Sequence, residues 1–237
     1  DGKSTSGITI ENAVQLIRGK QGTKVILGIY RDGKNIEFPL VRTRIEILSV
    51  VSQMHNINGV NGGIKVGYIR LKGFNANASR EMRKAIKALE TDGAEGYILD
   101  LRNNPGGLLE ASIDIARQWI DEGIIVSTQT REGIKAVRKA RGTALTERPV
   151  VLMVNQGSAS ASEILSGAIK DNQRGVLVGE KTYGKGLVQS VRGLSDGSGL
   201  TVTIAKYLTP SGADIHKNGI EPDIQVSMPT EEASSLL

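Results

Sequence analysis

The spacing of apolar residues divides the chain into a short first part and a longer second part. In residues 1–48, apolar positions recur every three to four residues between Thr9 and Arg18, which predicts an amphipathic helix. Two apolar stretches, 25–30 and 36–41, flank Asp32-Gly33, a dipeptide that favours the positive φ of a hairpin turn. One helix and one hairpin bury too little surface to fold alone, so we expect this unit to be part of a larger module.

The polar, glycine-rich stretch 49–65 is typical of a linker or wide turn, and it sets the expected domain boundary between 48 and 49. Beyond it, apolar runs alternate with amphipathic segments. The expected strands are 66–71, 97–101, 150–154 and 176–178, and the expected helices are 77–89, 109–120 and 160–170. After Lys185 the apolar period changes to two, as in a half-exposed strand. The pattern predicts an α/β (mixed α+β) fold with domains at 1–48 and 49–237.

Composition narrows the function classes. The chain has 237 residues, 39% of them hydrophobic, which suits one or two domains. Its formal net charge is +5, but the densest basic segment, 131–148, contains no aromatic residue and is typical of a solvated hairpin or loop. We therefore expect no nucleic-acid partner. No apolar run reaches the roughly 18 residues that a bilayer-spanning helix needs, so no integral membrane segment is expected either.

The absence of cysteine excludes disulfides, thiolate nucleophiles and cysteine-ligated zinc. The two histidines, His55 and His216, stand in polar surroundings typical of surface loops. Any catalytic base must therefore be sought among other residue types.

Three serines, Ser158, Ser160 and Ser162, stand where a buried strand gives way to a helix. A hydroxyl there is clear of the sheet, and the free N–H groups of the first helical turn can bind an oxyanion. Ser160 and Glu163 also have the S-x-x-E spacing of a helix capping box, so the spacing leaves both interpretations open. The run 157–161 does not match the G-x-S-x-G elbow of the α/β-hydrolases, so that family is disfavoured.

A serine nucleophile needs a neighbouring base, and Lys185, between Gly184 and Gly186, is the realistic candidate. A lysine acts as a base only when neutral. Lowering its pKa from about 10.4 to about 7 or 8 requires roughly 3–5 kcal/mol of desolvation or like-charge repulsion. Taken alone, Lys185 is better interpreted as an ordinary loop cation.

Two glycine-rich segments have further interpretations. Residues 179–185 match the G-x-x-x-x-G-K pattern of a phosphate-binding loop, but Gly186 replaces the magnesium-binding hydroxyl and 187–191 alternate like a strand. The turn 104–107 (Asn-Pro-Gly-Gly) offers backbone amides for an oxyanion hole, although a tight turn before a helix explains the same residues.

Taken together, the blocks 100–107, 158–164 and 179–186 resemble the carboxyl-terminal processing (tail-specific) peptidases, notably bacterial, cyanobacterial and plastid members. The resemblance covers nearly the whole chain, including 207–210 and 219–223. It implies a crotonase-like core and a serine endopeptidase that cleaves proteins near their C-termini through an acyl-enzyme, with no metal or cofactor. Its members act in the cell envelope, the periplasm or the thylakoid lumen.

The same resemblance implies a role for particular residues. Ser160 would be the nucleophile, Lys185 the general base, and Gln189 the residue that orients the lysine amine. The oxyanion hole would be formed by the backbone N–H groups of Gly106 and Ala161.

A supporting carboxylate is implied at Asp171, after the Ser160 helix. Residues 1–48 resemble the later part of a PDZ domain, whose helix lines a groove for substrate C-termini, while the earlier PDZ strands and the carboxylate-binding loop have no counterpart. The expected partners are proteins or peptides with accessible C-terminal tails. The alternative is a scaffolding remnant that binds such tails without cleaving them.

Overall fold

The computed structural model describes residues 4–44, 48–58 and 63–227. The chain forms two compact units, residues 1–47 and 48–237. The division lies one residue from the boundary that the sequence predicts.

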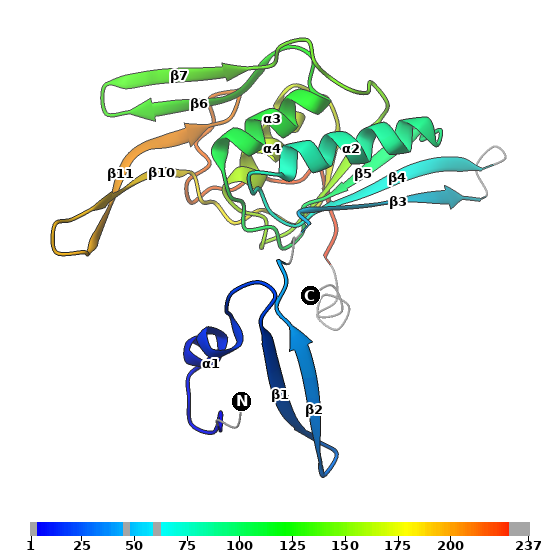
Figure 1. Ribbon diagram of the computed structural model, residues 1–237. Helices are drawn as coiled ribbons and strands as arrows, with labels where there is room; N and C mark the ends of the chain where they lie inside the picture. Colours follow the sequence, from blue (N-terminus) through cyan, green and yellow to red (C-terminus); the bar gives the residue numbers. More distant parts are fainter. Residues whose placement is uncertain (1–3, 45–47, 59–62, 228–237) are drawn as a thin grey trace. The chain divides into compact units, whose positions relative to one another are not determined.

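The first unit consists of one helix and one hairpin (Figure 1). Helix α1 (Ile10–Ile17) begins after Thr9, whose Oγ1 accepts a hydrogen bond from Asn12 N at 3.3 Å. Strands β1 (Lys24–Arg31) and β2 (Lys34–Val41) pair antiparallel through a turn in which both Asp32 and Gly33 have positive φ. The predicted helix and hairpin are confirmed.

The second unit is built on a six-stranded sheet with the order β12-β9-β8-β5-β4-β3. Its strands are β3 (Val50–Ile57), β4 (Ile64–Leu71), β5 (Gly96–Asp100), β8 (Val150–Val154), β9 (Val176–Gly179) and β12 (Ile224–Gln225). The strands from β4 to β12 pair parallel, and β3 pairs antiparallel with β4. Figure 1 shows helices α2 (Ala78–Thr91), α3 (Leu109–Trp119) and α4 (Ala161–Asp171) lying next to one another against this sheet.

A second sheet has the order β10-β11-β6-β7 and consists of two hairpins. One is formed by β6 (Ile124–Thr130) and β7 (Gly133–Lys139), the other by β10 (Leu187–Gly193) and β11 (Gly199–Leu208). The hairpins join through three residue pairs, between Lys206–Leu208 and Ser127–Gln129. Figure 1 shows both hairpins extending away from the helices.

The core lies between the six-stranded sheet and the three helices. Parallel strands are buried on both faces and are accordingly rich in Val, Ile and Leu. The fully buried side chains include Ile69, Leu99 and Leu152 from the strands and Met82, Ile86, Ile113, Trp119 and Leu165 from the helices. The strands β5 and β8 are neighbours and parallel, so the segments that follow their carboxyl ends meet at the same edge of the sheet.

The elements expected from apolar periodicity are confirmed, with ends that differ by at most two residues. The linker expected at 49–65 is wrong, because Val50–Ile57 forms β3, although residues 59–62 lie outside the described part. This edge strand leaves most of its side chains exposed, so its sequence lacks an apolar run. His55, expected in a loop, lies on β3 with its ring edge-on to Tyr68 at 5.9 Å.

Within the described residues, no helix has both the length and the apolar character needed to cross a membrane.

Candidate active site

Ser160 stands at the N-cap of α4, six residues beyond the end of β8, and its backbone conformation is unusual. Its φ is 57° and its ψ is −110°. A positive φ in a residue with a side chain costs about 1–3 kcal/mol and persists only where the surrounding structure imposes it. The turn therefore needs specific contacts to hold it.

One such contact comes from Glu163, whose side chain is 0% exposed. Its Oε2 accepts a hydrogen bond from Ser160 N at 2.8 Å, which is the side-chain half of the predicted capping box. The Glu163 amide in turn donates to the Ser160 carbonyl at 2.9 Å. The capping interpretation and the nucleophile interpretation of Ser160 are therefore compatible.

The same carboxylate also binds the loop that carries Lys185. Glu163 Oε1 accepts hydrogen bonds from Thr182 Oγ1 and Gly184 N, both at 2.6 Å. Glu163 Oε2, already bound to Ser160 N, accepts another from Lys185 N at 2.8 Å. A buried carboxylate is stable only when it is well partnered, and this one has four donors.

The lysine loop is further held by close backbone contacts. Lys217 N donates to Gly184 O at 2.8 Å, and Ile220 N donates to Thr182 Oγ1 at 2.7 Å. A Cβ on Gly186 would lie 2.5 Å from His216 N, so only glycine fits at this approach. Packing thus requires the glycine that follows Lys185.

The side chains of Lys185 and Gln189 have fewer contacts than the backbone of Lys185. Lys185 and Gln189 are exposed, and neither the lysine amine nor the Gln189 carboxamide has a hydrogen-bond partner among the residues described. Gln189 lies on β10 directly after a β-bulge at Val188, and bulges beside active sites commonly re-aim a side chain. The structure brings the Lys185 backbone to the Ser160 turn, with no hydrogen bond between the two side chains.

The glycine turn packs directly against the Ser160 turn. Gly106 has a φ of 98°, and a Cβ on it would lie 2.6 Å from Ala159 O and 2.9 Å from both Ala161 N and Ser160 Cβ. The two predicted oxyanion donors, Gly106 and Ala161, are therefore neighbours of Ser160. In the described part of the chain Ala161 N has no hydrogen-bond acceptor, whereas Gly106 N donates to Asn104 Oδ1 at 2.9 Å.

Asn104 is a residue whose importance sequence reasoning missed. It is 0% exposed, and its Nδ2 donates to Leu71 O at 2.7 Å. Its backbone carbonyl accepts from Ala159 N at 3.0 Å and from Ser162 Oγ at 2.9 Å. Asn104 therefore links β4, the turn at 104–107 and the turn that carries Ser160. The only signal in the sequence is an asparagine directly before Pro-Gly-Gly.

The serines that flank Ser160 are structural. Ser158 and Ser162 are both 0% exposed. Ser158 Oγ donates to Leu101 O at 2.8 Å and accepts from Asn155 N at 3.0 Å. Ser160, which is partly exposed, is the member of the trio that substrate can reach.

Asp171 is the last residue of α4, where its Oδ2 accepts a hydrogen bond from Ser211 N at 2.9 Å. The eleven residues of α4 span about 16 Å, so Asp171 lies at the other end of the helix from Ser160. The structure does not bring it to the predicted dyad.

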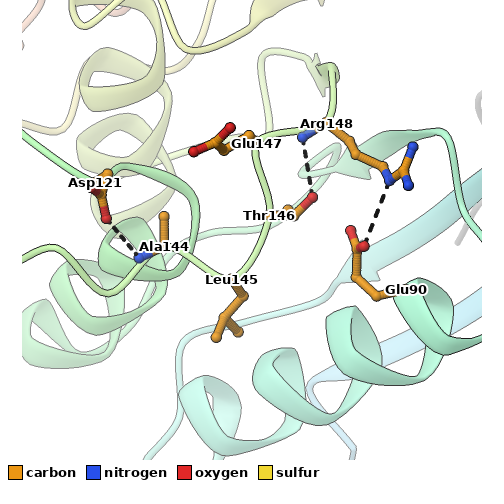
Figure 2. A pocket seen from close by; sticks show the side chains of 7 residues that line it. All are labelled: Glu90, Asp121, Ala144, Leu145, Thr146, Glu147 and Arg148. Carbon is orange, nitrogen blue, oxygen red and sulfur yellow. Dashed lines mark hydrogen bonds and ion pairs between the residues drawn. The ribbon is translucent and has the colours of Figure 1, made fainter.

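A depression of about 540 Å³ lies before β8, at the strand end remote from Ser160 (Figure 2). It is lined by Glu90, Asp121, Ala144, Leu145, Thr146, Glu147 and Arg148. Two of its three carboxylates are engaged: Arg148 Nε is 3.6 Å from Glu90 Oε2, and Ala144 N donates to Asp121 Oδ1 at 3.3 Å. No cluster of ligating side chains able to hold a metal ion occurs in the part of the chain described.

The phosphate-loop interpretation of 179–185 is not supported. The amides of Gly184 and Lys185 already bind the Glu163 carboxylate, and Leu187–Gly193 forms strand β10 where a helix would be required.

Comparison with known proteins identifies the family. The sequence model of the family described as Peptidase family S41 matches residues 65–226. The chain is 52% identical over 231 residues to a carboxyl-terminal-processing protease of Synechocystis sp. (strain ATCC 27184 / PCC 6803 / Kazusa), covering 97% of this chain and 53% of the relative. It is 41% identical to the carboxy-terminal processing protease of Bacillus subtilis (strain 168), covering 97% of this chain and 48% of that protein.

A solved structure, the photosystem II D1 C-terminal processing protease, matches with a TM-score of 0.71 and 36% identity. The match covers 96% of this chain and 61% of that one. The chain spans about half the length of the curated relatives it matches. With the family description matching residues 65–226 and relatives this similar, the chain belongs to peptidase family S41.

Proposed function

We propose that this chain carries the catalytic part of a serine endopeptidase that cleaves proteins near their C-termini, with Ser160 as nucleophile and Lys185 as general base. The observation that carries the proposal is the shared anchor of the two residues: both backbone amides bind Glu163 Oε2. The names of the relatives, carboxyl-terminal-processing proteases, supply the substrate class.

In the proposed reaction, Ser160 Oγ attacks the scissile carbonyl while the Lys185 amine takes the hydroxyl proton. The resulting oxyanion lies at the N-terminus of α4, where the Ala161 N–H is available to it. The C–N bond then breaks as the lysine passes its proton to the leaving amine. Water, deprotonated by the same lysine, then attacks the ester; the C–O bond to Ser160 breaks and the lysine returns the proton to Ser160 Oγ.

Two further groups complete the proposed site. Gln189 orients the Lys185 amine from strand β10. Gly106 supplies a second oxyanion donor, which requires its N–H to share or leave the hydrogen bond to Asn104 Oδ1. Because Lys185 is exposed, its amine is open to a bound substrate.

We extend the proposal to the fold and the first unit. The parallel sheet with its three helices would be a crotonase-like core, and residues 1–48 would be part of a PDZ module. Within that unit a groove of about 450 Å³ is lined by α1 and β1 residues, including Leu16, Ile17 and Ile26. The apolar part of this groove suits the side chains of an extended C-terminal tail.

Two assignments remain, the role of Asp171 and the compartment in which the protein acts. Asp171 would support the site indirectly, through the Ser211 loop that it holds. The names of the relatives print chloroplasts and bacteria, and within these we propose action in the bacterial cell envelope or periplasm, or in the thylakoid lumen.

A cleavage assay with a peptide ending in an apolar, unstructured tail tests the proposal. Ser160→Ala and Lys185→Ala should each lower kcat at least about 10³-fold, because each removes one of the two groups that carry the chemistry. Ser166→Ala is the matched control, since Ser166 Oγ is buried on the same helix without a partner among the described residues. Activity in Ser160→Ala equal to that of the unaltered chain would refute the dyad. Tail binding without cleavage by the unaltered chain would favour the scaffolding alternative.

A further inference from the structure

We infer that Glu163 is a positioning residue that fixes the base relative to the nucleophile, with Thr182 as its hydroxyl partner. The inference rests on the proposed function and deepens it. It adds a role for two buried residues that touch no substrate: Glu163 is 0% exposed and Thr182 is 5% exposed.

The geometry of Glu163 Oε2 is the main argument. This single oxygen lies 2.8 Å from Ser160 N and 2.8 Å from Lys185 N, so the two amide nitrogens are held within twice that distance of each other. Ser160 belongs to the start of a helix, whereas Lys185 belongs to a loop between two glycines. Other backbone hydrogen bonds also hold the lysine loop, such as Lys217 N to Gly184 O, but Glu163 Oε2 is the acceptor that joins the Lys185 amide directly to the Ser160 amide.

The second oxygen fixes the orientation of the first. Glu163 Oε1 accepts from Thr182 Oγ1 and Gly184 N, both at 2.6 Å. Thr182 Oγ1 in turn accepts from Ile220 N at 2.7 Å, which anchors the carboxylate to the backbone behind the lysine loop. Both oxygens therefore have two donors each, and rotation of the carboxylate would break all four hydrogen bonds.

The arrangement requires a carboxylate rather than any polar side chain. A carboxylate only accepts hydrogen bonds, on both oxygens, whereas a glutamine amide offers one accepting oxygen and one donating NH2 group. In Glu163→Gln the NH2 group must face one pair of donors, and because the Thr182 hydroxyl can also accept, at least one backbone N–H, that of Gly184, is left without its acceptor. Misplacing a catalytic group by about 1 Å costs on the order of 10²-fold in rate.

The experiment measures kcat, KM and Tm of the full chain for Glu163→Gln, Thr182→Val and Thr182→Ser. We expect Glu163→Gln to lower kcat on the order of 10²-fold with KM changed less than about threefold, because the substrate itself is not contacted. Thr182→Val should lower kcat about tenfold, and Thr182→Ser, which keeps the hydroxyl, should restore it to within about twofold. Ser166→Ala again serves as the control on the same helix as Glu163.

A double-mutant cycle separates positioning from folding. If Glu163 acts through Lys185, adding Glu163→Gln to Lys185→Ala should leave the residual rate unchanged within about twofold, although each single change is costly. A kcat in folded Glu163→Gln close to that of the unaltered chain, or fully additive losses in the cycle, would overturn the inference.

Failure of the proposed function has a different signature, because Ser160→Ala would then match the unaltered chain. In that event amide proton chemical shifts still test the inference. The Ser160 and Lys185 amide protons, each donated to a carboxylate oxygen, should both move upfield in Glu163→Gln. Shifts that stay in place for both residues would overturn the anchor itself.

Discussion

The backbone nitrogens of Ser160 and Lys185 lie at the same distance, 2.8 Å, from one oxygen atom, Oε2 of Glu163. The proposed nucleophile and the proposed base are thus joined through their main chains, while their side chains form no hydrogen bond with one another in the described residues. Backbone tethering leaves the amine able to travel between the serine hydroxyl and the leaving group. This division suits a base that must accept a proton in one step and deliver it in the next.

The contact between Gly106 and the Ser160 turn predicts that Gly106→Ala is inactive. The new Cβ would lie 2.6 Å from Ala159 O, at a φ of 98° that alanine rarely adopts. We expect kcat to fall at least about 10²-fold and Tm to fall as well, since the turn must move. Steady-state kinetics and thermal unfolding check this.

Gly193→Ala is the matched control for this prediction. A Cβ added to Gly193 would meet no atom within 4 Å, and the φ of this residue is not positive. The variant should keep near-normal activity. Full activity in folded Gly106→Ala would contradict the prediction, because it would show that activity does not need the close contact between Gly106 and the Ser160 turn.

The buried side chain of Asn104 predicts a large effect on stability. Asn104→Leu removes the acceptor of Gly106 N and the donor to Leu71 O. Each orphaned buried group costs about 1–3 kcal/mol, so we expect the free energy of unfolding to fall by about 2–5 kcal/mol. Urea denaturation measures this loss. Ser166→Ala, which orphans nothing, should be neutral or slightly stabilising, and an equally mild result for Asn104→Leu would contradict the network.

The buried ion pair of Asp100 and Arg102 predicts a pH-dependent stability. Burial, the largest influence, raises the pKa of Asp100, but hydrogen bonds from Arg102 and Tyr68 outweigh it and hold the pKa below its ordinary value of 3.8. The contribution of this carboxylate to stability is therefore present above pH 3.8 and is lost as the pH falls toward the lower folded value.

Arg102→Met leaves Asp100 buried without its cation. We expect the free energy of unfolding to fall by about 3–5 kcal/mol at pH 7. In this variant only the Tyr68 hydroxyl and the Arg102 backbone N–H still oppose burial, so the pKa of Asp100 is higher than in the unaltered chain and the gap in stability narrows as the pH falls. Denaturation series at several pH values check the sign. A gap that is constant or widens on acidification would contradict the assignment.

Much of the site could be predicted because its elements are local. The apolar run Val150–Val154, the helix after it and the S-x-x-E spacing are visible in a short stretch of sequence. The spacing predicts one partner of Glu163, the amide of Ser160. It cannot predict Thr182, Gly184 and Lys185, because those contacts depend on how a distant loop folds back against the helix.

The features that sequence reasoning missed share a physical cause. Strand β3 lies at a sheet edge and buries little, so hydrophobic alternation does not mark it. Asn104 is polar yet 0% exposed, and only its tertiary partners distinguish it from an ordinary turn residue. Asp171, which the sequence analysis named as a supporting carboxylate, is the last residue of α4 and is separated from Ser160 by the length of that helix, so its role stays a prediction.

The positive φ of Ser160 sets folding and reactivity against each other at one position. Glycine would relieve a strain of about 1–3 kcal/mol at an entropic cost of about 0.5–1 kcal/mol, so folding alone favours glycine there. A library selected only for thermal resistance should therefore drift toward glycine at this position and lose its hydroxyl. Serine at residue 160 lowers the stability of the fold, so only selection for its chemistry can maintain it.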